Sequence, residues 1–199
     1  MFSKLSFSRK PSKGHNRKSM ETTDSIQAAI AKYQRKKHAP MTVTAIARES
    51  GRTPQAFYVY FKSIPAAMRA LGKSVQRDVR EYRKGGRFSG TDREINEAVF
   101  KIVFDVMAQY GKVFYQICLD HDRSQYIHLI LVILYQDLRL PHLAQREKPR
   151  IDDPRIQTYL WCLVCTYQQW GRETKCNPKK TEPYMKKLIR YTEEISHRL

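Results

Sequence analysis

A short stretch in the first third of the chain carries side chains that can hydrogen-bond to a nucleic acid. Gln55 can read a base edge with two hydrogen bonds, and Tyr58 can donate one to a phosphate oxygen. On a helix from Pro54 to Phe61, these two side chains share the outer face with Val59. The inner face is apolar and consists of Ala56, Phe57 and Phe61. The pattern favours a helix that packs on one side and presents polar groups on the other.

Two short helices joined by a tight turn would hold these side chains in place. Thr42 is a typical helix N-cap, and the helix after it should end near Glu49, with Gly51 as its stop. Thr53 then caps a second helix with Pro54 at its first position, where the missing N–H costs nothing. This arrangement predicts a helix-turn-helix, whose second helix enters the DNA major groove. An ordinary helical corner is the alternative.

A longer helix is expected before this pair. Ile26, Ala29, Ile30 and Tyr33 recur at spacings of three and four, so a helix should begin near Asp24 and end near Lys37. Residues 1–22 have no such period and hold six Lys and Arg, which predicts a flexible basic arm. The arm is either a solvated tail or a segment that touches phosphate or the minor groove.

Residues 42–63 resemble the N-terminal helix-turn-helix of the tetracycline-repressor (TetR) family. The matching features are Thr42-Val43, Ile46-Ala47, Gly51, Tyr58, Tyr60 and Phe61 at the family's spacing. The stretch Ser25 to Ile30 also matches a common opening of the family, so the resemblance covers residues 24–70. It implies an all-α protein with a three-helix DNA-binding head, a connecting fourth helix and a larger C-terminal helical bundle. That bundle would bear a dimer interface and a pocket for a small-molecule inducer.

The resemblance and the side-chain chemistry together identify candidate DNA contacts. Thr53 and Gln55 are expected nearest the bases. The remaining candidates, several of them expected nearest phosphates, are Thr42, Arg52, Pro54, Tyr58, Tyr60 and Lys62.

The sequence departs from the family pattern in three places. Arg52 stands where the family has a small apolar residue. Pro54 and Gln55 fall where base-reading residues and often a glycine lie, which leaves the operator sequence open. Ile64-Pro65 replaces the usual Lys-Glu, so one phosphate contact is missing, and Lys62 is the candidate to replace it.

The charge of the chain points to a polyanionic partner. Its 199 residues carry a formal net charge of +18. Residues 1–90 hold 20 Lys and Arg against 5 Asp and Glu, whereas residues 91–199 hold 17 against 14. We expect a dimeric regulator of transcription, a repressor by family precedent, that binds a near-palindromic operator in double-stranded DNA. A nonspecific, charge-driven nucleic-acid-binding protein is the alternative, because charge alone gives affinity without sequence reading.

The hydrophobic pattern predicts helices throughout, so the fold class is all-α. The expected domains are the arm at 1–22, the helix-turn-helix domain at 23–70 with a connecting helix at 64–83, and a helical dimerisation and ligand domain at 91–199. Within the last domain, helices are expected at 91–110, 112–119, 125–140, 155–171 and 181–197, with the third of these buried and a polar loop at 142–153.

Two sets of apolar residues in the C-terminal half have alternative interpretations. The last two helices could form the seam of a dimer through Leu160, Trp161, Val164, Tyr167, Met185, Leu188 and Ile189, or these residues could form the core of one subunit. Aromatic residues could line an effector pocket or be ordinary core. The pocket candidates are Phe100, Phe104, Phe114, Tyr126 and Trp170.

Other kinds of chemistry find little support. Cys162 and Cys165 form a C-x-x-C inside an apolar run, where buried thiols are expected in place of a metal or redox site. No nucleotide-binding, hydrolase or metalloprotease motif occurs, and His121 between two aspartates is expected to be a polar turn. We expect no enzyme activity, cofactor or metal. With no secretory signal and no run of about 20 apolar residues, the expected location is the cytoplasm, at the nucleoid when DNA is bound.

Overall fold

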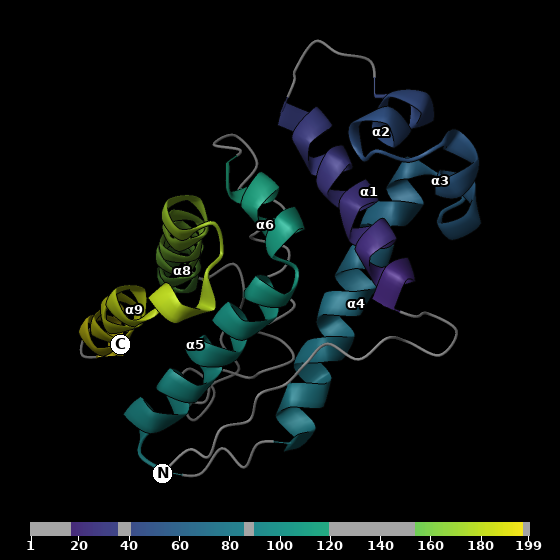
Figure 1. Ribbon diagram of the computed structural model, residues 1–199. Helices are drawn as coiled ribbons and strands as arrows, with labels where there is room; N and C mark the ends of the chain where they lie inside the picture. The colour runs from purple at the N-terminus through teal and green to yellow at the C-terminus, as the bar shows by residue number, and fades with distance from the viewer. Residues whose placement is uncertain (1–16, 36–40, 86–89, 120–153, 197–199) are drawn as a thin grey trace. The chain divides into compact units, whose positions relative to one another are not determined.

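The computed structural model describes residues 17–35, 41–85, 90–119 and 154–196, and every regular element in these ranges is a helix (Figure 1). The all-α fold class is confirmed. The chain divides into two compact units, Met1–Leu71 and Gly72–Leu199, and the division falls inside the long helix α4 (Ile64–Gly85). None of the described helices is long and apolar enough to cross a membrane.

The N-terminal unit contains α1 (Arg17–Arg35), α2 (Val43–Glu49), α3 (Pro54–Tyr60) and the first part of α4. Figure 1 shows α2 beside α1, with α3 following α2. One apolar cluster holds these helices together, and each contributes to it. Its buried members are Ile26, Ala29, Ile30, Tyr33, Ile46, Phe57, Phe61 and Ala67. The side-chain amide of Gln27 donates a 2.9 Å hydrogen bond to the Ala67 carbonyl, which joins α1 to α4 inside this cluster.

The first helix begins earlier than the sequence pattern predicts. It starts at Arg17, whereas the hydrophobic period predicts a start near Asp24, so part of the expected arm at 1–22 is helical. The added turns contain two local side-chain interactions. Arg17 pairs with Glu21 one turn later at 3.4 Å, and the Thr22 hydroxyl donates to the Lys18 carbonyl at 2.9 Å. Residues 1–16 lie outside the described residues.

The connecting helix α4 has the amphipathic pattern expected of it. Its buried stripe consists of Ala67, Leu71, Val75 and Val79, and its exposed basic residues are Arg69, Lys73, Arg77 and Arg80. Asp78 breaks the apolar stripe, because its carboxylate is buried beside Val75 and Val79. The sequence pattern did not indicate this buried charge.

The C-terminal unit contains the rest of α4 together with α5 (Asp92–Gln109), α6 (Gly111–Cys118), α8 (Pro154–Thr174), the short 3-10 helix η2 (Pro178–Lys180) and α9 (Glu182–Ser196). These helices lie close to their predicted positions. The expected helix at 125–140, the loop at 142–153, His121 and Tyr126 lie outside the described residues. In Figure 1, α8 and α9 run side by side, and α9 also contacts α5.

Helix α5 begins with a reciprocal cap. The Glu94 N–H donates to Thr91 Oγ1 at 3.4 Å, and the Thr91 N–H donates to the Glu94 carboxylate at 2.8 Å. Each of these two bonds satisfies a backbone group that the first turn of a helix leaves without a partner. The Thr91 N–H and the Thr91 hydroxyl both donate to the Glu94 carboxylate, and these donors lower the pKa of Glu94 below its ordinary value.

Candidate nucleic-acid interface

Two threonine caps define the ends of the candidate recognition helix and of the helix before it. Thr42 Oγ1 accepts a hydrogen bond from the Ala45 N–H at 3.2 Å, and Thr53 Oγ1 accepts one from the Ala56 N–H at 3.1 Å. Pro54 occupies the first turn of α3, as predicted. Because each cap acts within a few residues of its own helix, the start of α3 is fixed by local sequence.

The turn between α2 and α3 depends on one glycine. Gly51 has a φ of +68°, a left-handed conformation that a side chain disfavours. The turn is closed by two backbone hydrogen bonds, from the Gly51 N–H to the Arg48 carbonyl at 3.1 Å and from the Arg52 N–H to the Ala47 carbonyl at 2.8 Å. Paired bonds of this kind end a helix with a sharp change of direction. The predicted helix-turn-helix geometry is therefore present.

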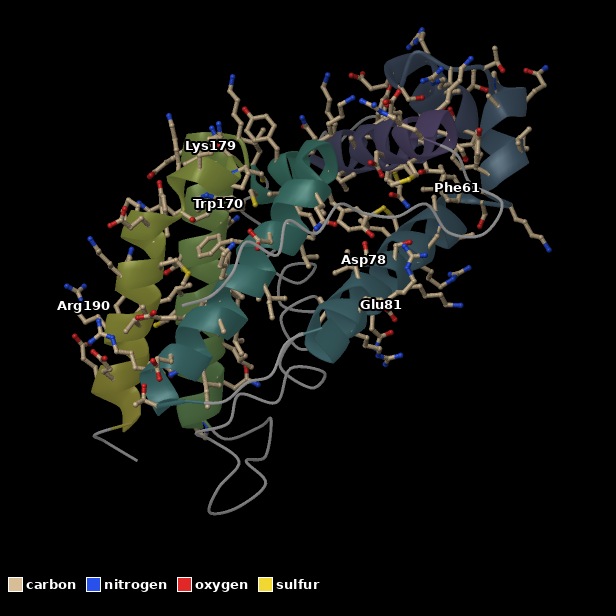
Figure 2. All side chains as sticks on the ribbon, turned by 60° about the horizontal axis from the view of Figure 1, so that its bottom comes forward. Phe61, Asp78, Glu81, Trp170, Lys179 and Arg190 are labelled. Atoms are coloured by element: carbon tan, nitrogen blue, oxygen red, sulfur yellow. The ribbon has the colours of Figure 1, made fainter. Side chains whose placement is uncertain are left out.

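Buried aromatic residues attach α3 to the unit. Phe57 is fully buried and Phe61 is 7% exposed, and their rings lie 5.8 Å apart. Figure 2 labels Phe61 at the end of α3. Helix α2 is tied to α1 by an ion pair between Lys32 and Glu49. With its inner face packed in this way, α3 presents the opposite face to solvent in a fixed orientation.

The outer face of α3 carries the predicted contact residues. Tyr58 is 60% exposed and Gln55 is also exposed. Of the other candidates, Thr42, Arg52, Thr53 and Lys62 are exposed, while Pro54 and Tyr60 are half-buried. Tyr60 packs against the apolar cluster of the unit, which accounts for its lower exposure. All eight residues lie on α3, on the turn before it or at the ends of the two short helices.

Two further side chains belong to this surface. Val59 is 76% exposed, the most exposed large apolar side chain among the described residues. Its place on the outer face was predicted, but a valine suggests no hydrogen bonding and was not counted among the contacts. Arg48 is exposed in the last turn of α2. Arg48 is a basic residue four positions before Arg52, and this spacing is the sequence signal that could have identified it as a DNA contact.

The charge of the N-terminal unit matches this surface. Residues 1–71 contain 14 Lys and Arg and 3 Asp and Glu. Among these acidic residues, Glu21 pairs with Arg17 and Glu49 pairs with Lys32. The unit therefore has a strongly positive field with little local compensation, which attracts a polyanion over distances beyond direct contact.

Comparison with known proteins gives one structural relationship. No family model matches the sequence, and no curated protein is similar to it. A crystal structure of a protein from Rhodococcus sp., assigned to the TetR family of transcriptional regulators, aligns with 88% of this chain and 99% of that chain. The TM-score is 0.51 and the sequence identity 16%.

The chain has a TetR-like fold. The likeness extends well beyond residues 24–70, to which the sequence resemblance is confined, because it takes in most of both units. It therefore concerns the architecture of the whole chain as well as the helix-turn-helix.

Within this TetR-like fold, most of the predicted seam residues are core. Leu160, Val164, Tyr167, Leu188 and Ile189 are buried within a single chain, none more than 8% exposed. They cannot form an exposed seam, because α9 packs along α8 and these side chains lie in the unit's interior. The core alternative is correct for them. Trp161 differs, being 45% exposed, and Met185 is half-buried.

Four of the five pocket candidates lie in the core of the C-terminal unit. Phe100, Phe104, Phe114 and Trp170 are each at most 1% exposed. Figure 2 labels Trp170 on α8. Its ring centroid lies 4.9 Å from that of Phe104 in an edge-to-face arrangement. Among the described residues, the indole N–H of Trp170 and the side-chain oxygen of Asn96 have no hydrogen-bond partner although both are buried.

The prediction that both cysteines of the C-x-x-C motif are buried is wrong. Cys162 is half-buried, but Cys165 is exposed. The inner face of α8 follows Tyr159, Leu160 and Leu163, and Cys165 falls on the outer face, one turn from the exposed Trp161. In the described part of the chain, no three His, Cys, Asp or Glu side chains gather in a way that could hold a metal ion.

Proposed function

We propose that this protein is a sequence-specific DNA-binding regulator of transcription, with α3 as the recognition helix. One observation carries the proposal: Gln55, Tyr58 and Val59 stand exposed on a helix whose opposite side chain, Phe57, is fully buried. A short helix held by a core aromatic residue and a threonine cap suits insertion into a groove. The TetR-like fold supports the same function.

The exposed side chains divide by chemistry into readers and positioning contacts. Gln55 hydrogen-bonds a base edge, with adenine as the preferred partner of an amide side chain. Val59 packs against a thymine methyl group, which is the apolar feature of the major groove. Tyr58, Arg52 and Lys62 bind phosphate oxygens and fix the register of the helix on the duplex.

Thr53 combines two roles in this proposal. Its Oγ1 accepts the cap hydrogen bond from Ala56, which leaves its hydroxyl hydrogen available as a donor to DNA. Thr42 has the same geometry at the start of α2, with its hydroxyl oxygen accepting from Ala45. Both threonines are exposed, so each can donate to a phosphate while it caps its helix.

We propose that the protein acts as a homodimer on a near-palindromic operator. Helix-turn-helix heads read two half-sites about one helical turn apart, which pairs naturally with two-fold symmetry. The exposed Trp161 on α8 is the candidate centre of an interface there, because tryptophan is enriched where protein surfaces meet. Met185, half-buried on the neighbouring α9, would extend the interface.

We also propose that a small molecule controls DNA binding and that the protein represses transcription. Trp170 and Asn96 support an effector, since each places an unpaired buried polar atom in an apolar unit. A ligand bound beside Phe104 could accept the indole N–H of Trp170. Repression is the action expected of the TetR family and is proposed on that basis, with the cytoplasm as the site of action.

The experiment that tests the function is selection of binding sequences from a random duplex library, followed by titration of the selected and a scrambled duplex at about 150 mM salt. We expect a preference of about a thousandfold or more and a footprint with two half-sites. Equal affinity for both duplexes, lost steeply as salt rises, would overturn the proposal in favour of charge-driven, nonspecific binding.

A further inference from the structure

Two buried cysteines that are distant in the sequence meet inside the C-terminal unit. Cys118 ends α6, and Cys176 lies in the turn between α8 and η2. Cys118 is fully buried and Cys176 is 3% exposed. Both side chains lie against the backbone of α8 at Gly171. They therefore form a pair of thiols that brings together two distant positions of the chain.

A glycine in α8 makes the room that this pair occupies. A Cβ atom at Gly171 would overlap the Cys118 sulfur and would lie 3.5 Å from the Cys176 sulfur. Both sulfurs are thus within 3.5 Å of a single point, against the bare backbone of the helix. Any side chain at 171 would displace the Cys118 sulfur, so the close approach of α6 and α8 depends on the glycine.

The backbone around Cys176 is held in an unusual conformation. Lys175 and Cys176 have φ values of 55° and 59°, in the left-handed region that L residues disfavour. The Cys176 N–H donates to the Gly171 carbonyl at 3.3 Å, and the Asn177 N–H donates to the Thr174 carbonyl at 3.2 Å. These bonds end α8 and hold the backbone of Cys176 in place, while the end of α6 holds Cys118.

We propose that Cys118 and Cys176 are a thiol-oxidation site at which a peroxide converts the pair into an intramolecular disulfide. One thiolate attacks a peroxide oxygen, the O–O bond breaks, and a sulfenic acid and water are formed after protonation. The second thiol then attacks the sulfenic sulfur, the S–S bond forms, the S–O bond breaks, and water leaves. In total two thiols and one hydrogen peroxide give one disulfide and two waters.

A hydrogen bond to Cys176 and burial raise the pKa of Cys118 well above its ordinary value, which keeps Cys118 as a thiol. Because both sulfurs are buried, the reaction requires local opening of the turn and is slower than oxidation of an exposed cysteine.

The C-x-x-C of α8 is the poorer candidate for a disulfide, although the sequence draws attention to it. Cys162 and Cys165 are three residues apart on a regular helix, where Cβ atoms are about 5–6 Å apart. A disulfide needs a Cβ separation of about 3.8 Å. Cys165 is exposed and so serves as an internal measure of how strongly the protein has been oxidised.

The test treats the full-length protein with hydrogen peroxide, blocks remaining thiols with a maleimide in denaturant, and analyses the digest by mass spectrometry. We expect a peptide pair joining Cys118 to Cys176, lighter by two hydrogens than the two reduced peptides and absent after treatment with dithiothreitol. The treatment is continued well beyond complete oxidation of Cys165, and if Cys118 and Cys176 both remain fully alkylated at that point, the proposal is wrong.

A matched variant makes the readout independent of the other cysteines. In Cys162→Ser/Cys165→Ser, two of the four thiols remain. Peroxide should remove both thiols together, and dithiothreitol should restore both. Adding Cys118→Ser to this variant should leave Cys176 unable to form the disulfide, with oxidation stopping at a sulfenic acid or higher oxide. An irreversible loss of one thiol in the parent variant would contradict the pairing.

Discussion

The phenol of Tyr110 donates a 2.7 Å hydrogen bond to one carboxylate oxygen of Asp78, and both residues are buried. The other oxygen accepts from the Arg77 guanidinium at 3.0 Å. Tyr110 stands between α5 and α6, while Asp78 lies on α4 (Figure 2). The bond therefore ties α4 to the start of α6 within the C-terminal unit, and it partners a charge that would otherwise be costly to bury.

We expect Tyr110→Phe to lower the free energy of unfolding by about 1.5–3 kcal/mol, because it removes a hydrogen bond to a buried charged group. Urea denaturation followed by circular dichroism measures the change. Tyr58→Phe is the control and should leave stability unchanged, since Tyr58 is 60% exposed. Equal stability of Tyr110→Phe and the wild type would mean that water replaces the phenol.

Alanine substitutions at two glycines should change stability in opposite directions. No described atom lies within 4 Å of a Cβ built at Gly51 or at Gly72, so steric overlap is not involved in either case. Gly51→Ala should destabilise by about 1–2 kcal/mol, because its φ is +68°. Gly72→Ala lies inside α4 and should stabilise by about 0.5–1 kcal/mol. The same denaturation assay checks both signs, and a loss of stability in Gly72→Ala would contradict this account.

The pair formed by Tyr184 and Glu173 should make stability depend on pH. The Tyr184 hydroxyl and the Gln169 amide donate to Glu173 and lower its pKa. Burial and the hydrogen bond to Glu173 raise the pKa of Tyr184 to about 12. The Glu173 contribution is present above the carboxylate's ordinary pKa and is lost as the pH falls through the lowered value. The Tyr184 contribution is present below the phenol's ordinary pKa and is lost as the pH rises through about 12.

Tyr184→Phe should therefore lose less stability than the wild type on acidification from about pH 5 to about pH 3. Denaturation midpoints across this range measure the difference. Tyr191→Phe, on the same helix, is the matched control and should keep the wild-type dependence. Parallel curves for Tyr184→Phe and the wild type would show that the hydrogen bond contributes nothing to acid stability.

Tyr58→Phe should weaken operator binding by about 1 kcal/mol, roughly fivefold, with the same factor for every DNA sequence. The reason is that a phosphate contact positions the helix without reading bases. Titration of the selected and scrambled duplexes measures both factors. An unchanged affinity would remove Tyr58 from the contacts, and a loss confined to the selected duplex would make it a base reader.

The helix-turn-helix could be predicted from sequence because its signals are local. Thr42 and Thr53 cap helices that begin at the next residue, and Gly51 occupies the one position with a positive φ in the turn. The start of α1 at Arg17 was missed, because its first turn carries the exposed polar pair Arg17–Glu21 and no apolar side chain of the buried face. Periodicity detects a buried face and does not detect an exposed first turn.

Long-range relationships could not be predicted. Leu160 and Val164 have the same apolar pattern whether they face α9 or a second subunit, and only the packing of α8 against α9 decides for the core. The Cys118–Cys176 pair and the Tyr110–Asp78 bond join segments far apart in the chain, and no spacing rule connects them. The candidate DNA contacts were accessible to sequence reasoning because they lie on one short helix and its turn.

The central claim is that α3 reads DNA sequence, and the most direct test is the base-preference profile of Gln55→Ala compared with that of the wild type, by selection from a random duplex library. We predict a relaxed preference at one base pair per half-site, worth about 1–3 kcal/mol, with the other positions unchanged. Lys62→Ala, a phosphate contact in this account, should lower affinity without changing the profile. An identical profile for Gln55→Ala and the wild type would contradict the claim that this face of α3 reads the bases.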